Sequence, residues 1–203
     1  MISKKELESR FVNACENVIA AEGELTEIDS KFGDADHGLT MHKIGNAIKE
    51  AVLASDGNIK EMLDDAAMAV MGLNGGSAVP LWNTWLDGMQ EGAPEAEEID
   101  VQGLKDLFAE AFEELDDMSG AKVGDKTMMD AVIPASQAIA DYTGDSAAEL
   151  FDLAAEAALK GAENTKNFVS KFGRAKTYGT KTIGTPDAGA VSMSKFFEGL
   201  AKA

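Results

Sequence analysis

Three aspartates and a histidine lie within ten residues, in a segment that contains two glycines. Asp29 and Asp34 are five residues apart, so on one straight helix their side chains would diverge by about 140°. We therefore expect a loop turning at Gly33 to bring Asp29, Asp34 and Asp36 together beside His37. Carboxylates held this close repel one another unless a cation lies between them, and oxygen ligands favour a hard ion such as Mg²⁺ or Ca²⁺ over Zn²⁺.

The same segment does not fit a calcium-binding EF-hand loop. If Asp34 is the first ligand, Leu39 occupies the position of the invariant glycine, and Gly45 occupies the twelfth position, which requires a bidentate Glu. Mg²⁺ takes fewer protein oxygens and completes its shell with waters and substrate phosphates. The sequence therefore predicts a Mg²⁺ site, and the alternative is that these aspartates cap helices on a solvated turn.

Composition and charge narrow the class of protein. The chain has 203 residues, of which 45% are hydrophobic and 27% charged, which is typical of a globular protein, and we interpret residues 1–203 as a single domain. The single cysteine, Cys15, excludes an internal disulfide framework. A net charge of −18 disfavours nucleic acid as a partner. No apolar run suits a membrane span or a signal peptide, so we expect no membrane partner and a cytoplasmic protein.

Apolar residues recur at helical spacing over most of the chain, whereas strand-like alternation is scarce. The clearest stripe runs from Leu104 to Met118 over four turns. The pattern predicts an all-α protein. The expected helices span residues 3–22, 38–54, 59–72, 77–92, 101–118, 127–142, 146–166 and 189–202.

Eight helices with mostly short connections predict an up-and-down antiparallel bundle or barrel, in which every second connection emerges at the same end. The chemically unusual residues all fall in alternate connections, which are 23–37, 73–76, 119–126 and 167–188. The connections between them look like ordinary turns. The alternation therefore predicts a composite site at one end of the bundle.

Glycine-rich turns occur in two of these connections. Asn74-Gly75-Gly76-Ser77 precedes a predicted helix, whose N-terminal amides can bind phosphate, and a tight turn capped by Ser77 is the alternative. Gly124-Asp125-Lys126-Thr127 resembles the end of a P-loop, but Asp125 separates the glycine from the lysine and no strand precedes it. Here we expect Asp125 to cap the next helix and Lys126 to be solvated, with a phosphate contact as the alternative.

The connection before the last helix is long, irregular and rich in cations. Loops of this kind commonly serve as lids or binding loops. A planar guanidinium can bind a phosphate through two hydrogen bonds, so Arg174 is the cation that we expect to act on a ligand. The alternative is a surface loop whose basic residues pair with the acidic body. His37 is likewise either a ligand contact or a salt-bridged loop residue.

Taken in order, these motifs closely resemble those of the nucleotide-binding L subunit of dihydroxyacetone kinase. No single motif decides the matter, but their order and spacing from residue 25 to the C-terminus are specific. The motifs are Leu25-Thr26-Glu27-Ile28-Asp29, Gly33-Asp34-Ala35-Asp36-His37-Gly38, Gly75-Gly76, Gly124-Asp125-Lys126-Thr127-Met128, Gly173-Arg174-Ala175 and Ile183-Gly184 with Asp187 and Gly189-Ala190.

The resemblance implies an eight-helix antiparallel barrel that holds ADP or ATP and two Mg²⁺ ions at one end. It implies that Asp29, Asp34 and Asp36 bind the metals and that Arg174 stabilises charge during phosphoryl transfer. The residues implied to line the nucleotide site are His37, Thr40, Met41, Gly76, Ser77, Ala78, Gly120, Met128, Arg174, Asp187 and Gly189.

The resemblance also implies partners. In the phosphotransferase-system branch, a phosphohistidine protein, the M subunit, rephosphorylates the resident ADP, and the γ-phosphate then passes to dihydroxyacetone on a separate K subunit. Two departures from the family pattern leave alternatives open. Residues 75–81 read Gly-Gly-Ser-Ala-Val-Pro-Leu instead of Gly-Gly-Ala-Ser-Gly-Pro-Leu, and Thr185-Pro186-Asp187-Ala188-Gly189 is also unusual. The alternatives are an ATP-dependent kinase subunit for a related short ketose and a non-catalytic adaptor that senses Mg-ADP.

Overall fold

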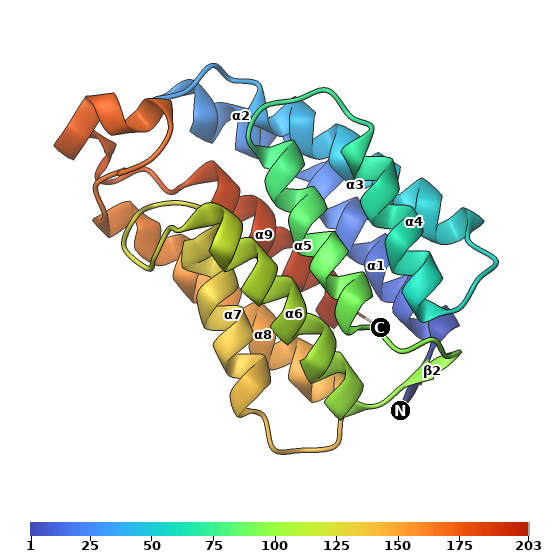
Figure 1. Ribbon diagram of the computed structural model, residues 1–203. Helices are drawn as coiled ribbons and strands as arrows, with labels where there is room; N and C mark the ends of the chain where they lie inside the picture. The colour runs from blue at the N-terminus through green and yellow to red at the C-terminus, as the bar shows by residue number, and fades with distance from the viewer. Residues whose placement is uncertain (203) are drawn as a thin grey trace.

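The computed structural model describes residues 1–202 and is almost entirely helical (Figure 1). The helices are α1 (Lys4–Ala20), α2 (Glu22–Ser30), α3 (His37–Ala54), α4 (Ile59–Met71), α5 (Ala78–Gly92), α6 (Val101–Ser119), α7 (Met129–Asp141), α8 (Ala147–Asn164) and α9 (Ala188–Ala201). Two 3-10 segments, η1 (Thr165–Asn167) and η2 (Arg174–Thr182), precede α9. A short antiparallel ladder pairs β1 (Ile2–Ser3) with β2 (Glu98–Ile99).

Within residues 1–202, eight helices close into a ring. Each packs against the next in the order α1, α3, α4, α5, α6, α7, α8 and α9, and α9 packs back against α1. The remaining helix, α2, packs against α3 and α9 at one end of the ring (Figure 1). The predicted all-α antiparallel barrel is therefore confirmed. No helix in the described part of the chain combines the length and apolar character that a membrane span requires.

The predicted loop over residues 23–37 is wrong in its first part. The chain breaks at Ala21 and continues as α2 to Ser30, so Asp29 lies in the last turn of a helix. Only Leu25 of α2 is fully buried. A helix at the end of the barrel has few residues facing the core, and its apolar pattern is too sparse to indicate it.

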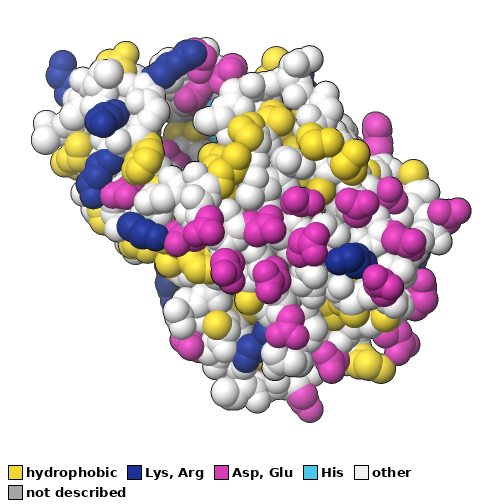
Figure 2. Space-filling view, viewed as in Figure 1, with side chains coloured by type: hydrophobic (Ala, Val, Ile, Leu, Met, Phe, Trp, Pro, Cys, Tyr) yellow, Lys and Arg dark blue, Asp and Glu magenta, His cyan; other side chains and the backbone are white. Residues whose placement is uncertain are grey.

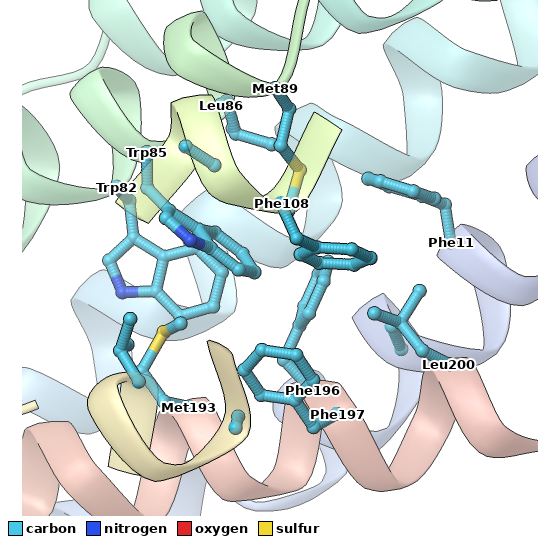
Figure 3. Close-up of a cluster of buried hydrophobic side chains, with 14 of the residues drawn as sticks. Phe11, Trp82, Trp85, Leu86, Met89, Phe108, Met193, Phe196, Phe197 and Leu200 are labelled. Carbon is cyan, nitrogen blue, oxygen red and sulfur yellow. The ribbon is translucent and has the colours of Figure 1, made fainter. Parts of the chain in front are cut away.

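Aromatic side chains fill the inside of the barrel (Figure 3). Trp82 and Trp85 of α5, Phe108 of α6, and Phe196 and Phe197 of α9 are each at most 2% exposed. Neighbouring ring centroids lie 5.2 to 6.3 Å apart, mostly in edge-to-face geometry. Such pairs add about 0.5–1.5 kcal/mol each beyond the burial of their area. The cluster thus ties α9 to helices on the opposite side of the ring.

Small residues close the ring between α1 and α9. A Cβ atom added at Gly199 would lie 2.3 Å from the Cα atom of Ala14, so the two backbones touch directly. Gly23 of α2 differs, since a Cβ atom there would have no neighbour within 4 Å. A substitution at Gly23 therefore tests helix propensity alone, whereas one at Gly199 also tests helix packing.

We expect Gly199→Ala to lower the free energy of unfolding by about 1–3 kcal/mol, because overpacking outweighs the better helix propensity of alanine. The control Gly23→Ala should raise it, by up to about 1 kcal/mol. Urea unfolding monitored by circular dichroism measures both changes. Equal stabilisation by the two substitutions would contradict the close crossing of α1 and α9.

Candidate functional site

A cavity of about 630 Å³ opens at one end of the barrel. Four connections contribute to its wall, and they join α2 to α3, α4 to α5, α6 to α7, and α8 to α9. In the space-filling view the molecule is hollowed here, with acidic side chains at the rim (Figure 2). The volume falls in the usual range for small-molecule and cofactor sites. The composite site predicted from the alternating connections is therefore present as a cavity.

The three aspartates of the sequence motif converge on this cavity. One carboxylate oxygen from each of Asp29, Asp34 and Asp36 lies within 4.8 Å of the others. Ala35 adopts a left-handed backbone with a φ of 63°, and the chain reversal there lets both of its neighbours face Asp29. Gly33 makes this close approach possible, because an added Cβ atom would lie 2.0 Å from a carboxylate oxygen and 2.9 Å from the backbone oxygen of Asp29.

The electrostatics of the cluster follow from this crowding. Burial, together with the negative charges of Asp34 and Asp29, raises the pKa of Asp36. A divalent cation between the carboxylates would remove that repulsion, and three oxygen donors suit Mg²⁺ better than Zn²⁺. The predicted convergence is observed, and the binding of metal by these residues stays a prediction.

Arg174 reaches the cluster from the other side of the cavity mouth. Its guanidinium Nη1 contacts Oδ2 of Asp34, while the side chain stays 69% exposed. The ring of Tyr178, also in η2, packs 5.2 Å from the ring of Phe32, which follows α2. The segment that contains η2 therefore lies over the aspartates, which is the arrangement expected of a lid.

His37 begins α3 beside the aspartates. Its ring Nε2 lies 3.3 Å from the Ser192 hydroxyl of α9, and its backbone N–H points at Asp29 Oδ2 at 3.5 Å. Burial lowers the pKa of His37, and the charge of Asp29 only partly opposes this effect. The lowered pKa disfavours the charged imidazolium that the salt bridge of the alternative interpretation requires.

The turn before α5 exposes backbone amides to the cavity. Gly76, Ser77 and Ala78 all line it, and the first amides of a helix have no partner within the helix. The Ser77 side chain makes no capping hydrogen bond, so the alternative of a Ser77-capped turn does not apply. The arrangement can accept an anionic group at the positive end of the α5 dipole.

The connection between α6 and α7 differs from its predicted form. The carboxylate of Asp130 accepts hydrogen bonds from the amides of Gly124 and Thr127, at 2.6 and 2.8 Å. Asp125 instead accepts from the Lys122 amide at 2.9 Å and pairs with Lys171 at 2.6 Å, so the predicted cap by Asp125 is wrong. An acid within the first turn of α7 takes that role.

Lys126 is buried, with 4% of its surface exposed, so the predicted solvated lysine is wrong. Lys126 forms part of the cavity wall, and its ammonium donates to four backbone carbonyls. Two further residues of the predicted nucleotide site are not part of the cavity wall, and their contact with nucleotide stays a prediction. Met41 is fully buried, one turn beyond His37 on the core face of α3. Gly120 ends α6 with a φ of 63° and lies outside the cavity wall.

The other predicted ligand residues do line the cavity. They are His37, Thr40, Gly76, Ser77, Ala78, Met128, Arg174, Asp187 and Gly189. An apolar part of the wall was not predicted from the sequence, since those of its members that lie in helices also satisfy the core pattern of their helices. It comprises Leu81, Trp82, Met118 and Pro186 among others, and such a surface can take a flat heterocycle.

Asp187 links the lid to α9. Its side chain accepts from the Ala190 amide at 2.8 Å and caps the helix, while its own amide donates to the Thr165 hydroxyl at 2.9 Å. Burial raises the pKa of Asp187 to about 7, with repulsion from Asp130 adding to the effect and Lys126 opposing it. Asp187 is therefore close to its titration point at neutral pH.

Comparison with known proteins identifies the family. Residues 31–202 match the family model described as the DAK2 domain. The chain belongs to the DAK2 domain family. This assignment agrees with the resemblance to the L subunit of dihydroxyacetone kinase, which is thereby confirmed.

Relatives of this DAK2 domain chain are kinases and kinase subunits. The ADP-binding subunit DhaL of PEP-dependent dihydroxyacetone kinase from Escherichia coli K12 is 27% identical over 197 residues, which cover 95% of this chain and 94% of the relative. A DhaL subunit of Listeria innocua is 30% identical, with 88% and 87% covered. The L-erythrulose kinase of Pectobacterium atrosepticum is 32% identical over 93% of this chain, and the DAK2 domain chain spans about one third (33%) of its length.

Solved structures share the fold of this DAK2 domain. The dihydroxyacetone kinase of C. freundii, in complex with AMP-PNP and Mg²⁺, superposes with a TM-score of 0.71 and 22% sequence identity. The match covers 97% of this chain and 33% of the kinase chain. The fold described above therefore also occurs in a solved structure.

We expect Asp187→Asn to become progressively more stabilising, relative to wild type, as the pH rises. The folded-state pKa lies above the unfolded value, so ionisation of Asp187 costs stability between about pH 4 and about pH 7. Asn removes this cost and still caps the helix. The comparison is made by urea unfolding at pH 5 and pH 8 without nucleotide.

Asp100→Asn is the matched control, because Asp100 caps α6 from an exposed position. It should show no comparable trend between the two pH values. A stability difference between Asp187→Asn and wild type that stays constant with pH would rule out the raised pKa.

Proposed function

We propose that this chain is the nucleotide-binding, phosphoryl-transfer subunit of a ketose kinase. The observation that carries the proposal is the meeting of three carboxylates and one guanidinium at the mouth of the cavity. A polyphosphate that binds to an acidic protein needs cations beside it, and bound metal ions in turn need carboxylates to hold them. The carboxylates hold metal ions, and the metal ions and the guanidinium together offset the charge of the phosphates.

The residues suit Mg-ADP or Mg-ATP. Asp29, Asp34 and Asp36 would hold Mg²⁺, and we propose two ions, the number that the resemblance to the L subunit implies. The amides at the start of α5 would bind a phosphate. The apolar wall would hold the base, with His37, Thr40, Met128 and Gly189 completing the lining.

Arg174 would act on the phosphoryl group in transit. Its side chain is exposed and comes from the lid, so it can follow the terminal phosphate without disturbing the barrel. Mg²⁺ supplies charge neutralisation when bound, and the guanidinium adds donors in a fixed plane. Arg174 is therefore the residue that we assign to catalysis.

The donor and acceptor are proposed from the relatives. The DhaL proteins of E. coli and Listeria innocua are named as ADP-binding subunits of PEP-dependent kinases, and this chain matches most of their length. We propose the same division here: a phosphohistidine protein rephosphorylates bound ADP, and the γ-phosphate passes to dihydroxyacetone on a separate K subunit.

The relatives are named for short ketoses of different carbon number. Erythrulose kinases from Pectobacterium atrosepticum and Mycolicibacterium smegmatis are 31–32% identical to this chain. Together with the altered turn at Ser77, this similarity supports a second candidate, an ATP-dependent kinase subunit for a four-carbon ketose. A non-catalytic adaptor that senses Mg-ADP is the candidate from another functional class.

We expect Asp34→Asn to weaken Mg-ADP binding by more than about 100-fold, because loss of even a supporting residue around a metal commonly costs 10–100-fold. Titration calorimetry with and without Mg²⁺ measures the effect. Asp64→Asn is the control, since it removes one exposed carboxylate of α4 that is not part of the cavity wall. Wild-type Mg-ADP affinity in Asp34→Asn would show that the metal assignment is wrong.

We expect ketose phosphate to form when the chain is mixed with a K subunit, the phosphohistidine donor system and ketose. Arg174→Lys should slow turnover by about 100-fold or more while Mg-ADP still binds, because a lysine cannot reproduce the planar guanidinium. Dihydroxyacetone and erythrulose are compared as acceptors, and ATP replaces the donor proteins in a parallel reaction.

The outcomes separate the candidates. Turnover with the donor proteins, and ADP that survives gel filtration of the purified chain, support the resident-cofactor function. Turnover with ATP alone supports the second candidate. Mg-ADP binding without any phosphorylated ketose supports the adaptor.

A further inference from the structure

Lys126 has surroundings that the proposed reaction does not use. Its ammonium donates to the carbonyl oxygens of Thr165, Phe168, Thr182 and Thr185, at 2.7, 3.1, 2.8 and 2.6 Å. Three protons serve four acceptors, so one proton is shared. We call these four carbonyls the carbonyl cage.

The cage binds the ammonium without an ion pair. Among residues 1–202, no carboxylate oxygen lies within 4.0 Å of Lys126 Nζ, and Asp187 and Asp130 act on it only from a distance. Burial lowers the pKa of Lys126, and those two charges oppose the shift. Four backbone carbonyls around one cation form the kind of environment that replaces the hydration shell of K⁺.

The cage joins the two ends of the lid. Thr165 and Phe168 lie where the chain leaves α8, whereas Thr182 and Thr185 lie where it returns toward α9. Two further bonds close the same base: the Gly184 amide donates to the Lys166 carbonyl at 2.7 Å, and the Ser170 amide donates to the Thr182 hydroxyl at 3.1 Å. Everything between these bonds, including Arg174, forms a loop that extends from a closed base (Figure 1).

The backbone conformation of Lys126 also indicates a specific role for its side chain. Its φ is 63°, a left-handed conformation that costs a non-glycine residue free energy and that glycine adopts freely. A lysine is nevertheless present here, one residue beyond an exposed turn. The strain is compensated by the cage, because the left-handed backbone aims the side chain across to the lid.

We infer that Lys126 is a positioning residue: its ammonium serves as a built-in monovalent cation that fixes both ends of the lid and so holds Arg174 over the phosphate end of the bound nucleotide. The second part of the inference rests on the proposed function. The first part, the locking of the lid base by a cation in the carbonyl cage, does not.

Two variants distinguish the contribution of the ammonium from those of the backbone conformation and of the side-chain stem. Lys126→Gly keeps the left-handed conformation, and Lys126→Met keeps an apolar stem without the charge. In both, we expect hydrogen exchange at the Gly184 and Ser170 amides to accelerate at least about tenfold, since buried carbonyls lose their donor. Mg-ADP affinity should fall by about 10- to 100-fold, because the lid also supports Asp34 through Arg174, and loss of support around a metal site commonly costs that much.

Chemical rescue tests the role of charge. Butylammonium replaces the missing side chain of Lys126→Gly, and it should restore slow exchange and Mg-ADP affinity, whereas 1-butanol should not. Lys166→Met is the matched control, because this exposed lysine lies on the same segment and its side chain is outside the cage. It should leave the exchange at both amides unchanged.

Each result has a consequence. Unchanged exchange in Lys126→Met, or equal rescue by butanol, would overturn the inference. If wild type binds no Mg-ADP, the proposed function fails, while exchange and rescue still decide the cage. Should both variants fail to fold, ¹⁵N NMR of wild type remains, in which the Lys126 ammonium protons must exchange with water more slowly than those of Lys166.

Discussion

Mutual repulsion of Asp29, Asp34 and Asp36 is the constraint on which the other features of this end of the protein depend. Three carboxylates within 4.8 Å can persist only where other interactions fix the backbone. The fixing comes from two sources, a helix end that carries Asp29 and a left-handed residue, Ala35, that orients the other two. Neither element is stable alone, so the cluster needs the barrel beneath it.

The barrel can support the cluster because the interactions that stabilise it lie away from the open end. The aromatic cluster between α5, α6 and α9 and the close crossing of α1 and α9 hold the ring together without any residue of the charged cluster. The open end can therefore carry strain and like charges that would unfold a smaller scaffold. The hydrophobic burial that stabilises the barrel lies at its centre, whereas the repulsion between carboxylates lies at its open end. The two contributions to stability are therefore spatially separated.

The sequence was sufficient for the features that local chemistry determines. Periodicity predicted the ring helices, and alternate connections predicted the shared end, because both depend on residues close together in the chain. It failed for α2, whose single buried Leu25 gives no periodic signal. It also failed for Lys126, since the partners of its ammonium lie 39 to 59 residues away and are backbone atoms, which leave no mark on composition. Met41 lies on the buried face of α3, and its predicted contact with nucleotide stays a prediction.

The exposed cations of residues 165–186 and the buried ammonium of Lys126 act over different ranges. Residues 165–186 contain Lys166, Lys171, Arg174, Lys176 and Lys181 and no carboxylate, although the whole chain has a net charge of −18. These positive charges draw the lid toward the acidic end of the barrel and lower the electrostatic barrier to the approach of an anionic ligand. An exposed charge alone would leave the lid mobile, since surface pairs contribute little. The buried ammonium of Lys126 supplies the complementary effect, because a desolvated cation bonded to four carbonyls is directional and insensitive to salt. Attraction and orientation are thus assigned to separate residues on facing loops.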